Sequence, residues 1–197
     1  MIKLNFGCGP FHLDGWTNVD YQNKGEPAPD LHFNVQNPEY PWEKNSVDFI
    51  YASHLLSLFW ESDILDILRQ WHSILKPGGV LRIVEPNFEW FLDQYFKKSE
   101  TGKVVFESSV LKTKRDLDDV RRSGKQFYTP AHQFQWDYNR WGHKFLFDSE
   151  TLEAFLRKGV GFSGVKHCAI NLSPHKGLNN IDRQRSSGGE LFVEAVK

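Results

Sequence analysis

The sequence has few cysteines, no long apolar run and almost no excess of charge. Only two of its 197 residues are cysteines, Cys8 and Cys168. They form no C-x-x-C pair, so neither a disulfide framework nor a cysteine-based metal site is predicted. No apolar stretch approaches roughly 18 residues, and no secretory leader opens the chain, so we expect no membrane-spanning helix. The formal net charge of −1 gives no reason to expect nucleic acid or a membrane as a partner, and we expect a cytoplasmic protein.

Three common ligand-binding signatures are also missing. The dinucleotide fingerprint G-x-G-x-x-G requires a third glycine where this chain has His12, and an acid about 20 residues on, whereas Asp20 comes earlier. This disfavours an NAD-linked dehydrogenase. No G-K-[ST] follows the glycines, which excludes a Walker A loop. The eight histidines show no H-x-x-x-H spacing and no cluster with cysteine, so no metal is predicted.

The most informative stretch is the first twenty residues, which predict a strand, a glycine turn and a second strand. Ile2 to Phe6 is a short apolar-rich run, Gly7-Cys8-Gly9 interrupts it, and Asn18-Val19-Asp20 is a second strand that ends in an acid. Glycines at a strand end let the backbone approach a ligand closely. An acid at the tip of the neighbouring strand can accept hydrogen bonds from ribose hydroxyls. The stretch therefore predicts a nucleoside-binding edge.

The remainder alternates strand-like and helix-like segments, which predicts a parallel α/β sheet in one domain spanning residues 1–197. The last two predicted strands have no helical pattern between them, which implies an antiparallel strand at one edge. Residues 11–16 are too few for a full crossover helix. We expect a variable lid or acceptor-binding insertion at about residues 99–140, with a charged helix-like piece at 112–122. The predicted strands are 31–35, 46–52, 80–84, 161–170 and 191–196, and the predicted helices are 62–75, 88–98 and one that begins after Asp148 or Ser149 and ends at Gly159.

Two strings, Leu4-Asn5-Phe6-Gly7-Cys8-Gly9 and Gly15-Trp16-Thr17-Asn18-Val19-Asp20, resemble motif I of the class I S-adenosylmethionine (SAM)-dependent methyltransferases, in the variant of the type 11 branch. The helix followed by Lys76-Pro77-Gly78-Gly79 and a strand is similar to the same family. The resemblance covers residues 1–95 well and 141–197 loosely. It implies a Rossmann-like three-layer sandwich with a mostly parallel seven-stranded sheet and an antiparallel edge strand. It also implies methyl transfer from SAM to a small or sugar-containing acceptor, on oxygen rather than nitrogen.

The resemblance implies a set of residues that bind SAM. The glycine turn would wrap the methionyl part, Asp20 would accept both ribose hydroxyls, and Tyr21 would border the adenine. After the third strand, where the family commonly has an acid, this chain has Asn34 and Val35. Ser53 and His54, after the fourth strand, would line the cofactor. The implied set is Phe6, Gly7, Cys8, Gly9, Asp20, Tyr21, Asn34, Val35, Ser53 and His54.

The acceptor side is less defined by the sequence. His54, His143 and Glu85 are the candidates for a base that takes the acceptor's proton. Structural roles stay open for two of them, because His143 could bond a backbone carbonyl and Glu85 could cap the next helix. The segment after His54 lacks the later Glu-His pair of the family. An alternative function is therefore a SAM-binding regulatory or scaffolding protein without turnover. The oligomeric state is not predicted.

Overall fold

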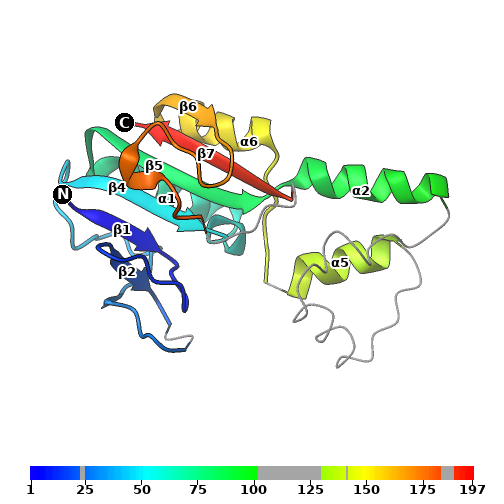
Figure 1. Ribbon diagram of the computed structural model, residues 1–197, viewed down its shortest axis with the longest axis horizontal. Coiled ribbons are helices and arrows are strands. Elements are labelled where there is room, and N and C mark those ends of the chain that lie inside the picture. The colour runs from blue at the N-terminus through cyan, green and yellow to red at the C-terminus, as the bar shows by residue number, and fades with distance from the viewer. Residues whose placement is uncertain (23–24, 102–129, 141, 183–188) are drawn as a thin grey trace.

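The computed structural model describes residues 1–22, 25–101, 130–140, 142–182 and 189–197. Its centre is one seven-stranded sheet with the order β3-β2-β1-β4-β5-β7-β6 (Figure 1). The strands are β1 (Lys3–Phe6), β2 (Thr17–Asp20), β3 (Leu31–His32), β4 (Val47–Ser53), β5 (Leu75–Pro86), β6 (Ser163–His167) and β7 (Glu190–Val196).

The strand directions confirm a mostly parallel, Rossmann-like sheet. Strands β1 to β5 pair in parallel with their neighbours, whereas β7 runs antiparallel to both β5 and β6. The antiparallel strand was expected at an edge, but β7 lies one place inside it and β6 is the edge strand. Strand β7 follows β6 in the chain and lies between β5 and β6, so it pairs with both strands.

One face of the sheet is covered by helices. Helix α1 (Glu61–Ile74) follows the predicted 3.6-residue period and turns its apolar residues onto the sheet. Trp71 of α1 stacks on Phe6 of β1 with ring centroids 5.4 Å apart, and both side chains are fully buried. Helix α6 (Ser149–Ala154) begins at the predicted cap, where Asp148 accepts a hydrogen bond from the Thr151 N–H, and it continues as one turn, η2 (Phe155–Val160). The buried residues of α1 are Ile64, Ile67, Leu68, Trp71 and Ile74.

The opposite face is covered by loops in the part of the chain that the structure describes. The register aligns a row of buried polar side chains across five strands: Asn18, Asn5, Tyr51, Arg82 and Glu194. As expected, the short 11–16 connection forms turns and no helix. The segment 168–182, which leads out of β6, crosses the same face in front of β5 and β7 (Figure 1).

A buried ion cluster fixes this second loop to the sheet. The Arg82 Nε donates to the Asp182 carboxylate at 2.9 Å, and the Arg82 Nη1 donates to Glu194 at 2.6 Å. The guanidinium also donates to the backbone carbonyls of Ala169 and Leu172, both at 3.2 Å. All three charged side chains are almost fully buried. The loop therefore covers this face both by hydrogen bonds to the polar row and by apolar packing, because its Leu178 belongs to a buried cluster with Val80 and Phe192.

Two helices form an arm beyond the carboxyl end of β5 (Figure 1). Helix α2 (Phe88–Thr101) starts where the Asn87 side chain accepts from the Glu89 N–H at 3.0 Å. Helix α5 (Pro130–Arg140) contacts α2. The single-domain assignment and the insertion at 99–140 stay predictions, and the predicted helical piece at 112–122 lies outside the described residues. No helix in the described ranges is both long and apolar enough to cross a membrane.

Candidate active site at the carboxyl edge of the sheet

The turn after β1 wraps tightly around the tip of β2. The Gly7 and Cys8 N–H groups donate to the Val19 carbonyl at 2.8 and 3.2 Å. Gly7 has φ +67°, and an added Cβ would come within 2.9 Å of the Leu55 side chain. Gly9 has φ +52°, but an added Cβ there would meet open space. The turn thus needs glycine for its conformation, and its Gly9 side is open to a ligand.

Asp20 is bound directly to this turn. Its Oδ2 accepts from the Gly9 N–H at 2.9 Å, and its Oδ1 accepts from the Gln22 N–H at 3.0 Å. The residue is 8% exposed. A carboxylate has about four lone-pair sites, so two amide contacts fix its orientation and leave capacity for two ribose hydroxyls. The structure therefore brings Gly9 and Asp20 together as predicted.

A network of asparagines holds the loop beyond the turn. Asn5 donates to the Phe11 carbonyl at 3.0 Å and to the Asn18 side chain at 2.9 Å. The Asn18 Oδ1 accepts from the Leu13 N–H at 2.8 Å. Asp30 accepts from the backbone and side-chain N–H groups of Asn18, and these bonds hold the Asp30 pKa below its ordinary value. Asn5 was not predicted to have this role, although an asparagine inside an apolar strand was the available signal.

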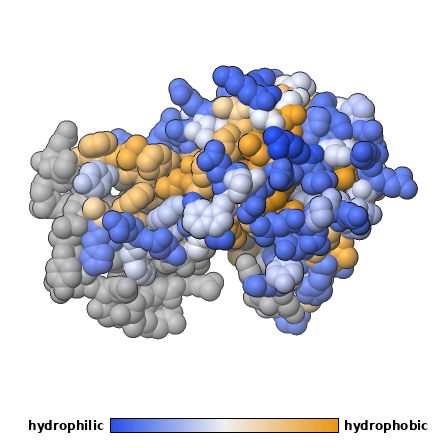
Figure 2. Space-filling view, turned by 180° about the vertical axis from the view of Figure 1, so that it is seen from behind, coloured by the Kyte–Doolittle hydropathy of each residue, from blue (hydrophilic) through white to orange (hydrophobic). Residues whose placement is uncertain are grey.

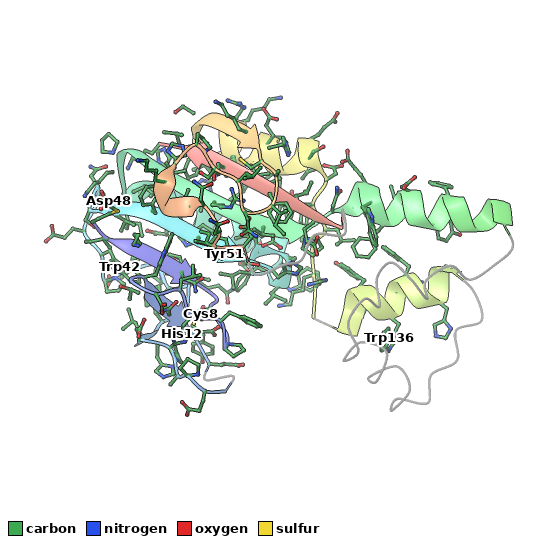
Figure 3. All side chains as sticks on the ribbon, in the orientation of Figure 1. Cys8, His12, Trp42, Asp48, Tyr51 and Trp136 are labelled. Carbon is green, nitrogen blue, oxygen red and sulfur yellow. The ribbon has the colours of Figure 1, made fainter. Side chains whose placement is uncertain are left out.

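Cys8 is a filler of the turn rather than a nucleophile. Burial, together with the carboxylates of Asp20 and Asp30, raises the pKa of the Cys8 thiol to about 11. The thiol is therefore neutral near pH 7. Cys8 and His12 lie together at the end of the sheet opposite Asp48, which marks the amino end of β4 (Figure 3).

The predicted adenine side is less well formed. Strand β3 ends at His32, short of the predicted 31–35, because the Asn34 Oδ1 accepts from the Gln36 N–H at 3.0 Å and turns the chain. The Val35 side chain lies in the core, and its carbonyl accepts from the Tyr40 hydroxyl at 2.6 Å. Tyr21 is 65% exposed. Phe6 is fully buried, so only its backbone could reach a cofactor at this edge.

The segment after β4 turns sharply at His54. This residue has φ +51°, a left-handed conformation uncommon outside glycine and often found at functional sites. Its N–H donates to the Val84 carbonyl at 2.8 Å. Ser53, the last residue of β4, is buried. Ser53 and His54 thus lie at the same edge of the sheet as the glycine turn.

The Glu85 carboxylate binds the start of the next turn, η1 (Leu56–Leu58). It accepts from the backbone N–H groups of Leu55, Leu56 and Ser57 at 3.0, 2.7 and 3.3 Å. Although these bonds favour the charged form, burial raises the Glu85 pKa to about 7. Glu85 therefore caps η1 rather than α2, and its carboxylate positions the segment that carries His54.

This burial predicts a pH dependence of stability that Glu85→Gln removes. Between about pH 4.5 and 7, the folded state holds a proton that the unfolded state releases, so the free energy of unfolding falls as pH rises through this window. Across this window we expect the free energy of unfolding to fall by roughly 3 kcal/mol. Urea unfolding at about pH 5 and about pH 8 should show it in the parent and in Glu61→Gln, an exposed control. An equal loss in Glu85→Gln would contradict the assignment.

His143 is brought to the same region from the far end of the chain. The Lys144 and Phe145 N–H groups both donate to the Ser57 carbonyl, at 2.7 and 3.2 Å. The His143 ring lies 5.9 Å from the ring of Tyr138 on α5. The segment after α5 is therefore tied to η1, and η1 is tied to Glu85. The three candidate bases His54, His143 and Glu85 belong to one connected set of elements.

The residues at this edge fit SAM. The open side of Gly9 can receive an amino-acid tail, and the oriented Asp20 carboxylate can receive a ribose. SAM supplies a methyl group that its sulfonium already activates. The chain's own residues would bind and orient it, with Gly7 to Gly9 and Asp20 as the principal contacts.

Comparison with known proteins agrees with this geometry. Residues 13–83 match the family described as "Methyltransferase domain". A SAM-dependent methyltransferase of Archaeoglobus fulgidus has a TM-score of 0.56 at 14% identity, over 99% of this chain and 85% of that one. A possible histamine N-methyltransferase of Thermotoga maritima has a TM-score of 0.54 at 15% identity, over 100% of this chain and 82% of that one. The CurJ carbon methyltransferase has a TM-score of 0.52 at 15% identity, over 100% of this chain and 48% of that one.

At these identities the structural matches show the fold, and the match over residues 13–83 adds the family's sequence pattern. The comparison with curated protein sequences found no match. The strand order, the glycine turn joined to Asp20 and the family match lead to the same assignment. Residues 13–83 therefore carry the sequence pattern of a methyltransferase domain, on a fold that SAM-dependent methyltransferases share.

Proposed function

We propose that the enzyme methylates an oxygen atom of a small acceptor, with sugar-containing compounds included in that class. The cofactor part of the proposal rests on the 2.9 Å bond from the Gly9 N–H to Asp20, which would join the two halves of the cofactor site. The oxygen acceptor rests on the candidate bases His54 and His143 near the same edge of the sheet. The structural neighbours do not decide the acceptor, because one is titled a possible N-methyltransferase and another a carbon methyltransferase.

Oxygen methylation requires in-line placement and a base. The acceptor oxygen would form a bond to the methyl carbon as the carbon–sulfur bond breaks, and the electron pair of that bond would stay on sulfur. The hydroxyl proton would pass to a neutral imidazole nitrogen of His54 or His143. Glu85 would act as a positioning residue, because its oxygens already accept three backbone N–H groups.

A cytoplasmic location stays a prediction.

The test combines binding with transfer of label. Calorimetry should show that the purified chain binds SAM, and methyl-labelled SAM should label one or more members of a panel of alcohols, phenols and sugars. Amine and thiol analogues of each acceptor serve as controls, and we expect at least tenfold less label in them. Preferential labelling of the amines would overturn the oxygen assignment. SAM binding without label in any acceptor or in cell extract would instead favour the regulatory alternative.

A further inference from the structure

An apolar pocket lies between the two helices of the arm. Four residues of α2 at positions i, i+3, i+4 and i+7 form one of its walls, and α5 forms the other. The pocket has a volume of about 280 Å³. Apolar residues also gather over this arm on the molecular surface (Figure 2). The lining residues are Phe88, Phe91, Leu92, Tyr95, Ala131, Phe134 and Gln135.

The mostly apolar lining of this pocket favours an apolar ligand over a sugar. Among the described lining residues, only Tyr95 and Gln135 carry side-chain polar groups. A sugar in this pocket would therefore bury several unpaired hydroxyls, each at a cost of about 1–3 kcal/mol. An aromatic ring or short acyl chain would gain roughly 25 cal/mol for each Å² of apolar surface removed from water. The volume, near the lower end of small-ligand pockets, suits a body of that size.

The pocket is connected to the reaction edge by aromatic rings. The rings of Phe91 and Phe134 are 5.7 Å apart, Phe134 and Tyr138 are 6.3 Å apart, and Tyr138 and His143 are 5.9 Å apart. His143 precedes Lys144, whose N–H donates to η1 at Ser57. At the other end, α2 begins two residues after β5, and the Phe88 N–H donates to the Phe147 carbonyl at 2.8 Å. Helix α2 therefore starts, and helix α5 ends, near the edge of the sheet that carries the candidate cofactor residues.

We propose that the pocket between α2 and α5 binds the aryl or short acyl body of the acceptor, so that its hydroxyl extends along the aromatic row toward His143. The inference rests on the proposed function and narrows the acceptor to hydroxyl compounds with an apolar body. A sugar-containing acceptor then needs an apolar aglycone to occupy the pocket.

The test is a binding titration with the full chain in the presence of demethylated SAM. The probes are 4-propylphenol, which has an apolar body, and methyl glucoside, which has none, followed by ligand-observed NMR. Ala131→Trp fills the pocket and should raise the Kd for the phenol at least tenfold. Asp93→Trp adds the same side chain at an exposed position of α2 outside the lining, and should leave the Kd unchanged. Both variants should retain the parent unfolding midpoint and SAM affinity.

Three outcomes would overturn the pocket assignment. One is equal phenol affinity in the parent and Ala131→Trp, and a second is equally tight binding of the glucoside. The third is that Ala131→Trp abolishes self-association or vesicle binding instead, which would identify a second copy or a lipid surface as the occupant. Because the readout is phenol binding, a chain that bound the phenol without binding SAM would overturn the proposed function and leave the pocket assignment standing.

Discussion

Asp20→Ala is expected to weaken SAM binding about a hundredfold. Two hydrogen bonds from ribose hydroxyls to a carboxylate contribute roughly 1.5 kcal/mol each, and about 3 kcal/mol corresponds to a factor of a hundred in Kd. The change also removes the acceptor of the Gly9 N–H, which loosens the turn that faces the methionyl part. Calorimetric titration with SAM measures the effect directly.

Two variants separate ribose binding from support of the turn. Asp20→Asn keeps one acceptor oxygen, which can still bind Gly9, and should cost about tenfold. Asp14→Ala removes an exposed acid six positions earlier and should leave the Kd unchanged. If Asp20→Ala bound SAM as tightly as the parent while it remained folded, the carboxylate would not be the ribose contact.

Arg82→Ala is expected to lower the free energy of unfolding by about 3–5 kcal/mol, the usual cost of removing one partner from a buried ion pair. The change leaves the Asp182 and Glu194 carboxylates buried without their cationic partner. It also removes two donors to the loop carbonyls. Arg69→Ala is the matched control, because Arg69 pairs with Asp66 where both side chains are largely exposed. We expect that control to change stability by less than about 1 kcal/mol. Urea unfolding measures both.

The triple variant Arg82→Met, Asp182→Leu and Glu194→Met tests the reason for this loss. If buried carboxylates without a cationic partner cause the loss, the triple variant should recover most of the stability lost by Arg82→Ala. Apolar groups of similar size often replace buried ion clusters without loss of stability. A loss below about 1 kcal/mol in Arg82→Ala would contradict the buried cluster.

The sequence predicted best those features that depend on local chemistry. The glycine turn needs backbone at positive φ, and glycine reveals that requirement directly at Gly7 and Gly9. The apolar period of α1 and the Asp148 cap placed α1 and the start of α6 within about two residues, and the predicted end at Gly159 falls in η2. Strand β3 was predicted too long, because the side-chain bond at Asn34 competes with the ladder.

Features that depend on distant pairing could not be predicted. Arg82 lies in an apolar strand, and nothing local indicates that Asp182 and Glu194 will meet it. The sequence offered Glu85 as a base or a cap, but the choice of η1 over α2 depends on how two strand ends meet. The apolar pocket likewise requires α2 and α5 to lie side by side, which no short-range pattern specifies.

The loop cover also has a consequence for biosynthesis. The bonds from Arg82 reach partners 100 and 112 positions later in the chain, so Arg82 cannot be fully paired until the ribosome has passed residue 194. Until then Arg82 and its neighbours stay hydrated on an unfinished sheet. Because such distant contacts form late and slowly, we expect the pairing of Arg82 to be among the last steps of folding.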